Sequence, residues 1–83
     1  MEEKAVVIFK RNYTDKGVDI EIPLTISVNE LIFGLNEAFN LGLDIGNPAE
    51  CYMKARNPIA LLRGEKTLLD YGIRNGSIIF MDR

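Results

Sequence analysis

The sequence of 83 residues contains no histidine and a single cysteine, Cys51. Without histidine, a Cys–His nucleophile pair is excluded, and a zinc site built from Cys and His has no ligand set. One cysteine cannot form an internal disulfide, so nothing here points to an oxidising compartment. We interpret Cys51 as a structural residue of a strand, and we expect no metal ion and no other cofactor.

Long hydrophobic runs and an excess of positive charge are missing too. No run approaches the roughly 18 apolar residues that a membrane-spanning helix needs. The first residues lack the cationic start and the cleavage site of a secretory signal, so we expect a cytoplasmic protein without membrane insertion. The net charge is −2 and the isoelectric point is near 5.0, which argues against nucleic acid as the main partner.

Acidic residues are present, but their spacing does not indicate an active site. A catalytic centre needs acids, bases or nucleophiles that converge. Here the carboxylates are spread over expected turns and strand faces, at Asp15, Asp19, Glu21, Asp44, Asp70 and Asp82. Gly72 and Gly76 lack the strand, loop and helix setting of a phosphate-binding loop, and turn geometry explains both. We therefore expect a protein that is not an enzyme.

The composition that remains, 47 % hydrophobic and 27 % charged, is that of one small globular domain over residues 1–83. Residues 4–11 hold an apolar, β-branched run that predicts a first strand. Residues 12–17 supply turn chemistry and end in Gly17. Residues 18–22 alternate strictly, so Val18, Ile20 and Ile22 share one face of a second strand.

The next segment has the signature of a helix. The stretch Ser27-Val28-Asn29-Glu30 fits a capping box, and Gly42 is the predicted stop. Gly34 lies inside this helix, where we interpret it as allowing close packing on the sheet. One stripe at helical spacing is apolar: Leu31, Ile32, Leu35, Ala38 and Phe39.

The second half of the chain alternates short elements and breaks. We expect, in order, a loop over 43–50, a strand over 51–56, a break at Asn57-Pro58, an edge strand over 59–62, a one-turn helix over 67–70, a turn at Asn75-Gly76 and a closing strand. Thr67 and Asp70 are suited to cap the one-turn helix. Tyr71 is expected to be half-buried, with its hydroxyl bonded to nearby backbone.

This order predicts an α+β roll, in which a mixed sheet of four to five strands carries one long helix on one face. The expected core draws on both strands of the first hairpin, the helix and the closing segment. Its members are Val7, Phe9, Val18, Ile20, Ile22, Leu31, Leu35, Phe39, Met53, Leu68, Ile73, Ile79 and Met81.

Two motifs carry a resemblance to known proteins. Thr67-Leu68-Leu69-Asp70-Tyr71-Gly72-Ile73 is similar to the Thr-Leu-Ser-Asp-Tyr-Asn-Ile segment of ubiquitin, and the element order is that of the ubiquitin-like β-grasp fold. More narrowly, the chain resembles the bacterial YukD/EsaB proteins. Lys10-Arg11-Asn12-Tyr13 ends the first strand as in that family, and residues 69–76 match its Leu-x-Asp/Tyr-x-Ile-x-Asn/Asp-Gly turn.

The resemblance implies an accessory protein of the Gram-positive type VII secretion system, which exports small helical proteins with a Trp-x-Gly motif. It implies a regulatory or assembly role and brings no catalytic residues with it. The alternative is a sulfur-carrier or modifier-like β-grasp protein, which needs a C-terminal glycine. The chain ends in Met81-Asp82-Arg83, so we expect a protein that is not conjugated. A ubiquitin-like fragment of a larger scaffold is a third reading.

The parity of the strand residues predicts a binding surface. Lys4 and Lys10 share parity with Val6 and Ile8, which places this apolar pair on the face away from the core. Asp82 assigns Ile78 and Phe80 to the same face in the closing strand. If the two strands are neighbours, these four apolar residues form one exposed patch, bordered by Asp19 and Glu21 on one side and by Tyr52, Lys54 and Arg56 on the other.

An apolar patch rimmed by opposite charges is typical of a protein-binding surface. We expect it to bind a protein partner, including components of the secretion system, or a second copy in a weak homodimer. Phe80→Asp should then leave the fold intact. The alternatives are apolar residues that the sheet merely tolerates, or a loop that covers them. The cations Lys54, Arg56, Arg63 and Lys66 form either a basic patch for an anionic partner or a dispersed solvated face.

Overall fold

The structure is a computed structural model, and it describes residues 3–12 and 14–81. Tyr13 and Asp82, on which parts of the sequence argument draw, lie outside the described residues. The elements alternate short strands with one long helix. In chain order they are β1 (Lys4–Lys10), β2 (Val18–Pro23), α1 (Val28–Phe39), the 3-10 helix η1 (Pro48–Glu50), β3 (Tyr52–Arg56), β4 (Ala60–Arg63) and β5 (Ile78–Phe80). For the first four strands, each observed end lies within one residue of the predicted one.

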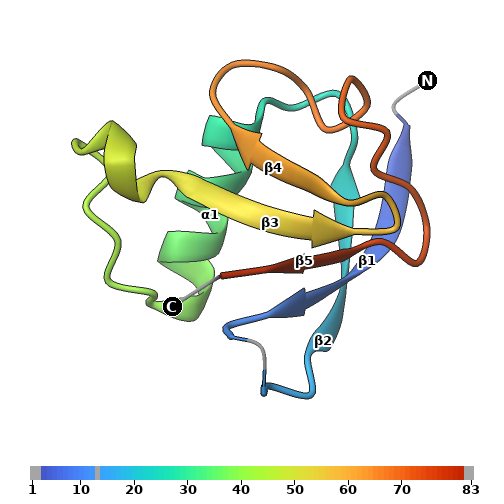
Figure 1. The fold of residues 1–83 in the computed structure, drawn as a ribbon, viewed down its shortest axis with the longest axis horizontal. Helices are drawn as coiled ribbons and strands as arrows, with labels where there is room; N and C mark the ends of the chain where they lie inside the picture. Colours follow the sequence, from blue (N-terminus) through green and yellow to red (C-terminus); the bar gives the residue numbers. More distant parts are fainter. Residues whose placement is uncertain (1–2, 13, 82–83) are drawn as a thin grey trace.

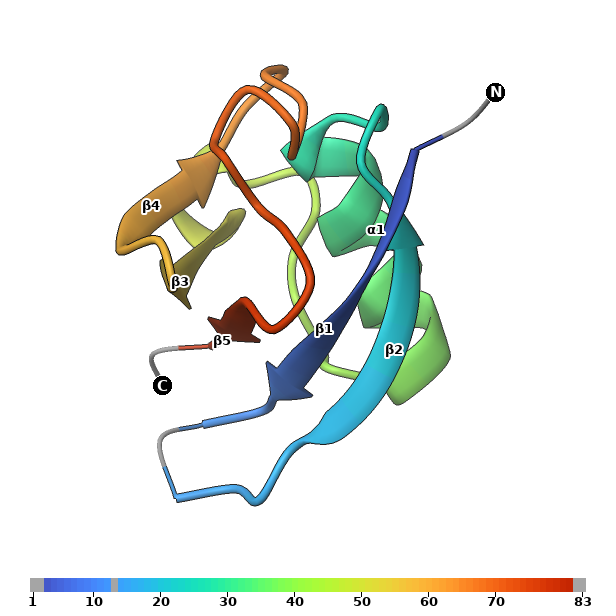
Figure 2. The ribbon, with the colours of Figure 1, turned by 90° about the vertical axis from the view of Figure 1, so that its right-hand side faces the viewer.

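The strands form one five-stranded sheet in the order β2-β1-β5-β3-β4. β1 and β5 run parallel at its centre, and the other neighbouring pairs are antiparallel. Figure 1 shows α1 behind this sheet, and Figure 2 shows it from the side, with the strands curving around the helix. The predicted α+β roll with one helix on one face is confirmed.

The first hairpin follows from alternation and from one glycine. Ala5, Val7 and Phe9 face the helix and are buried, as the period of two predicts. Gly17 ends the turn with φ of 85°, a conformation that glycine adopts without strain. A Cβ atom at this position would lie 2.7 Å from Cγ2 of Ile8, so a side chain has no room there.

The helix begins as predicted and ends earlier. The Ser27 hydroxyl oxygen accepts from the Glu30 N–H at 3.1 Å, and the Glu30 carboxylate accepts from the Ser27 N–H at 3.5 Å, which completes the capping box. The predicted stop at Gly42 is wrong, because Asn40 takes the left-handed conformation with φ of 53° and ends α1. Asparagine tolerates this conformation better than other residues with a side chain.

Gly34 does not serve close packing on the sheet, so that prediction is also wrong. It is exposed, and an added Cβ would meet nothing within 4 Å. The C-terminal end of α1 is anchored at Phe39 instead. The Phe39 carbonyl accepts a hydrogen bond of 3.0 Å from Nη2 of Arg11, and its ring centre lies 4.8 Å from that of Phe9.

The core lies between α1 and the inner face of the sheet. Its buried residues are Ala5, Val7, Phe9, Ile22, Leu24, Val28, Leu31, Ile32, Leu35, Leu43, Met53, Ala55, Leu62, Leu68, Ile73, Ile79 and Met81. Val18 was expected among them, but 48 % of it is exposed at the turn end of the hairpin. Ile20 and Phe39 are only half-buried, and Ala38 is exposed.

The segment before β5 forms successive turns where a one-turn helix was predicted. The capping pair is present: the Thr67 hydroxyl oxygen accepts from the Asp70 N–H at 3.1 Å, and the Asp70 carboxylate accepts from the Thr67 N–H at 3.2 Å. However, the N–H groups of Leu68 and Leu69 donate to carbonyls in the stretch before α1. These bonds tie the segment to another part of the chain, and Gly72, with φ of 77°, ends the turn.

Candidate functional site

The candidate site is the face of the sheet that α1 does not cover, here called the outer face. Strand register places its residues in rows that cross the sheet. One row runs through Asp19, Ile8, Ile78 and Arg56. The next runs through Lys10, Phe80, Lys54 and Leu61. The predicted parity is therefore observed for the apolar and basic residues of these strands.

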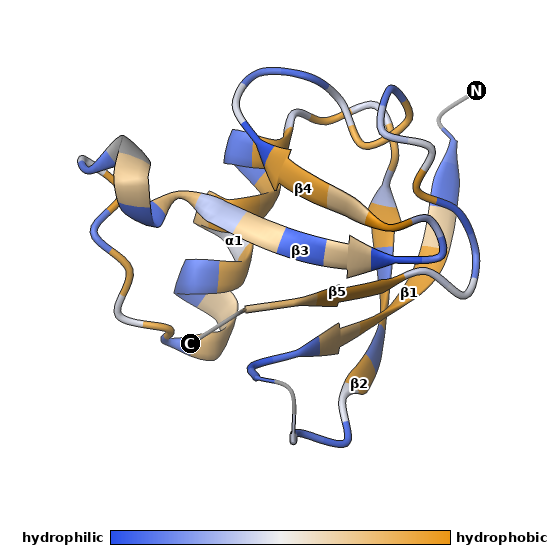
Figure 3. Cartoon of the chain, in the orientation of Figure 1, coloured by the Kyte–Doolittle hydropathy of each residue, from blue (hydrophilic) through white to orange (hydrophobic). Residues whose placement is uncertain are grey.

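The middle of the outer face is apolar. We call Val6, Ile8 and Ile78 the central strip. Ile8 and Ile78 are register partners in the parallel pair of β1 and β5. Val6 is 45 % exposed, whereas Ile8 and Ile78 are half-buried. Figure 3 shows the apolar colour running through β1 and β5, with hydrophilic turns at the ends of the sheet.

Phe80 belongs to this face, but it is not exposed. Only 4 % of it is accessible, so the expectation of an exposed Phe80 is wrong. The guanidinium carbon of Arg56 lies 5.6 Å from the centre of its ring, and Lys10 and Lys54 are its register partners on either side. Long cationic side chains cover apolar surface with their methylene groups, which parity alone does not predict.

Charge is divided across the outer face. The acidic residues Asp19 and Glu21 both lie on β2, which is one edge of the sheet. The cations Lys54 and Arg56 lie on β3, near the opposite edge. Lys4 bridges to Glu21 at 3.9 Å, between side chains that are more than half exposed, and a pair of this kind contributes little. Apart from Lys4 and Lys10 at the two ends of β1, the outer face therefore has an acidic side, an apolar middle and a basic side.

Two apolar residues of this face were missed in the sequence. Ile59 is 90 % exposed in the turn between β3 and β4, and Leu61 on β4 is 47 % exposed. Both line a hollow whose other walls include Lys54, Arg56 and Phe80. Leu61 shares parity with Arg63, so the argument used for the other strands would have assigned it to the outer face.

Not all of the remaining residues named from the sequence lie on the basic side of the outer face. Tyr52 is half-buried and pairs with Arg63 across β3 and β4, so both join the basic side. Lys66 lies in the loop after β4, where its carbonyl accepts from the Val28 N–H at the start of α1. Of the four cations for which the sequence left a basic patch or a dispersed face open, Lys54, Arg56 and Arg63 lie on the strands and Lys66 does not.

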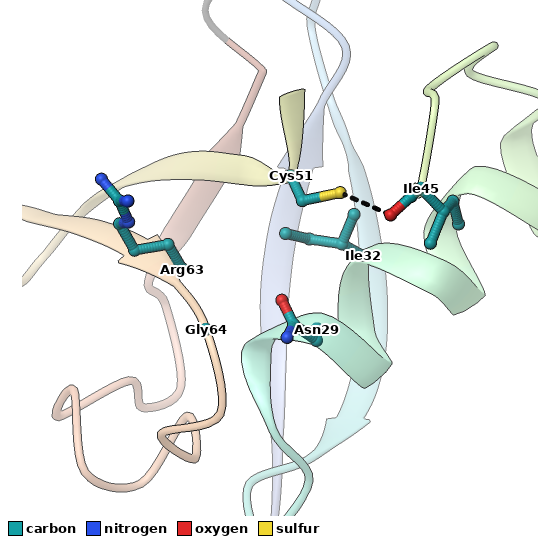
Figure 4. A pocket seen from close by; sticks show the side chains of 6 residues that line it. All are labelled: Asn29, Ile32, Ile45, Cys51, Arg63 and Gly64. Atoms are coloured by element: carbon teal, nitrogen blue, oxygen red, sulfur yellow. Dashed lines mark hydrogen bonds between the residues drawn. The ribbon is translucent and has the colours of Figure 1, made fainter. Parts of the chain in front are cut away.

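A second hollow lies between α1 and the start of β3 (Figure 4). The Cys51 thiol donates to the carbonyls of Ile45 at 3.5 Å and Asp44 at 3.7 Å, which ties the loop after α1 to β3. Asn29 donates to the Glu65 carboxylate at 2.7 Å. These contacts give Cys51 the predicted structural role, although it lies just before β3 and not within the strand.

Among residues 3–12 and 14–81, no group of three or more His, Cys, Asp or Glu is placed to hold a metal ion. In the same part of the chain, no helix has the length and apolar character needed to cross a bilayer.

The order of the strands, the helix α1 after the first hairpin and the return of β5 to pair with β1 define a ubiquitin-like protein of the β-grasp type. A solved structure, described as the solution structure of a ubiquitin-like domain from tubulin-binding cofactor B, matches with a TM-score of 0.73. The match covers 96 % of this chain and 89 % of that chain at 24 % identity, which supports the fold alone. A search of curated protein sequences finds no match.

The family model described as "WXG100 protein secretion system (Wss), protein YukD" matches residues 6–81. The chain therefore belongs to the YukD family, and the resemblance found in the sequence is confirmed. Membership makes it a ubiquitin-like module of the type VII secretion system.

Proposed function

We propose that this protein is a non-catalytic, cytosolic accessory of the secretion system, and that it binds a protein component of that system through its outer face. The observation that carries the proposal is the central strip, which α1 leaves uncovered at the middle of the sheet. Val6 is 45 % exposed there, between an acidic and a basic side. An apolar centre with a polar rim is the usual composition of a protein interface.

The buried ring below this surface adds to the argument. Phe80 lies between the register partners Lys10 and Lys54, with the Arg56 guanidinium over its ring. Arg56 is the exposed member of this pair, and arginine side chains in well-packed positions contribute a large share of the binding energy in many interfaces. The adjoining hollow beside Ile59 and Leu61 offers space for an apolar side chain of a partner.

Site-specific photo-crosslinking in the native host tests this proposal. A photoreactive phenylalanine analogue replaces Val6 on the outer face, and in a matched strain it replaces Phe33, which is 54 % exposed on α1. Crosslinks from position 6 to a component of the secretion system, with none from position 33, are expected. Crosslinks from position 33 alone, or from neither position, would overturn the proposal.

A secretion assay provides the second arm. Val6→Asp is expected to abolish complementation of a deletion strain for export of a Trp-x-Gly substrate, because a buried carboxylate in the interface is costly. Phe33→Asp makes the same chemical change on the helix and should complement fully. Thermal unfolding of both purified variants verifies that each is folded. Full complementation by a folded Val6→Asp variant contradicts the proposed role of the outer face.

A further inference from the structure

The division of charge on the outer face makes it complementary to itself. In one row across the sheet, Asp19 on β2 is followed by Ile8, Ile78 and then Arg56 on β3. The row therefore reads acidic, apolar, apolar, basic. Consider a two-fold axis that lies above the outer face, parallel to the strands and midway between β1 and β5. Rotation by half a turn about this axis reverses the order of the row. A second copy placed face to face in this way sets Asp19 opposite Arg56 and Ile8 opposite Ile78.

The next row is compatible with the same arrangement. This row contains Lys10 and Phe80. Phe9 pairs with Val18, so the residue opposite Lys10 is Gly17, which comes just before β2. The rotation therefore places Gly17 of the second copy opposite Lys54 and Lys10 of the second copy opposite Phe80, so no lysine lies directly opposite another. The contact between Asp19 and Arg56 occurs twice in a two-fold dimer, so its electrostatic gain is doubled.

Other ways of joining two copies are less favourable. An axis that crosses the strands would bring the Asp19 row against the Glu21 row, with like charges opposed. Pairing of two β2 edges would also bring the acidic side chains of both copies together. At the β4 edge, the Arg63 carbonyl already accepts a hydrogen bond of 2.9 Å from the Tyr71 hydroxyl, so continued strand pairing loses an acceptor.

We infer that the outer face binds a second copy of this chain, face to face, with Asp19 of each copy against Arg56 of the other. The inference rests on the proposed function in that it uses the same surface. The dimer covers the central strip of both copies, so the second copy and the secretion partner compete for one site. Self-association then sets how much of the protein is available to the partner, and this fraction falls as its concentration rises.

Sedimentation equilibrium on the purified full chain tests the dimer. Concentrations from about 10 µM to about 1 mM, in about 0.05 M and about 0.5 M NaCl, cover weak association with strong and weak electrostatic attraction. We expect a monomer–dimer equilibrium that shifts towards the monomer by about tenfold at high salt. A monomer at every concentration in low salt overturns the inference, and this arm requires no variant.

Charge reversal then tests the predicted contact. Asp19→Arg and Arg56→Asp should each weaken the dimer by about tenfold, since each sets like charges opposite one another twice. An equimolar mixture of the two variants should dimerise as the wild type does. In the mixed dimer, the two substituted side chains face each other with opposite charges, and the native Asp19 and Arg56 form the second contact. Glu37→Arg, with the same change of charge on the exposed face of α1, is the control and should have no effect.

The outcomes separate this inference from the proposed function. Failure of the mixture to restore dimers, with both variants folded, overturns the inferred geometry. A protein that is monomeric but still crosslinks from position 6 to a secretion component overturns the dimer and leaves the proposed function standing. A protein that dimerises but gives no such crosslinks overturns the proposed function and leaves the dimer standing.

Discussion

The guanidinium carbon of Arg56 lies 5.6 Å from the centre of the Phe80 ring, on the face of the sheet opposite α1. A cation over an aromatic face is attracted to the ring, by about 0.5–1 kcal/mol at exposed sites. The contact explains how a phenylalanine at an outward strand position is only 4 % exposed. Phe80 is therefore a structural residue of the outer face, and this changes what its substitution should do.

Phe80→Ala should lower the free energy of unfolding by about 3 kcal/mol, the order of magnitude for a buried aromatic residue. The loss comes from apolar surface that Arg56 and the neighbouring lysines no longer cover. Urea denaturation measures the change. Ile59→Ala is the control, because Ile59 is 90 % exposed and should change stability by less than about 0.5 kcal/mol. Equal stability of the two variants would contradict the burial of Phe80.

Ser77→Ala should destabilise the protein by about 1–3 kcal/mol. The Ser77 side chain is fully buried, its hydroxyl donates to the Asn57 carbonyl at 2.6 Å, and it accepts from the Arg74 N–H at 3.0 Å. Alanine leaves both backbone groups without this partner and frees the turn between β3 and β4. Urea denaturation of Ser77→Ala, compared with the exposed Thr25→Ala, tests the claim, and similar stability of both would refute it.

Tyr71→Phe should cost about 1 kcal/mol, because it removes a hydrogen bond of 2.9 Å from the hydroxyl to the Arg63 carbonyl. The bond ties the end of β4 to the turn before β5, so amide exchange should become faster in β4 than in β1. Hydrogen exchange followed by NMR resolves the two strands. Tyr52→Phe removes a hydroxyl from β3 as the matched control. Uniform acceleration in all strands would show that the bond has no local role.

The carboxyl of Asp15 should make the stability of the fold depend on pH. Hydrogen bonds from the N–H groups of Arg11 and Gly17 hold the pKa of its carboxyl below the ordinary value of about 3.9. Since the pKa is lower in the folded state, the stabilisation is present above the unfolded value and is lost as the pH falls through the folded one.

The wild type should therefore lose stability between about pH 5 and pH 2 more steeply than Asp15→Asn. Denaturation at a series of pH values gives both slopes, and an NMR titration of the carboxyl gives its pKa directly. A pKa at or above the ordinary value, or equal slopes, would disprove the role of these hydrogen bonds.

Much of the fold could be predicted because it depends on local patterns. Alternation assigned the faces of β1 and β2, and the Ser27–Glu30 pair marked the start of α1 before any tertiary contact was considered. The end of α1 was misplaced because both Asn40 and Gly42 have positive φ, and composition does not decide which of them ends the helix. The segment at 67–70 has the predicted capping pair but forms turns that Gly72, with φ of 77°, ends, and its hydrogen bonds to the stretch before α1 join parts of the chain that local patterns do not relate.

The candidate site shows the same division. The sequence by itself determined which strand residues point to the outer face, since alternation along an extended backbone is a local geometric property. Only the tertiary structure decided how far each of them is exposed. Arg56 covers Phe80, Val18 is exposed at the turn end of the hairpin, and the order of the strands separates the acids of β2 from the cations of β3. Burial and charge separation depend on which strands become neighbours, and that is a relation between segments far apart in the chain.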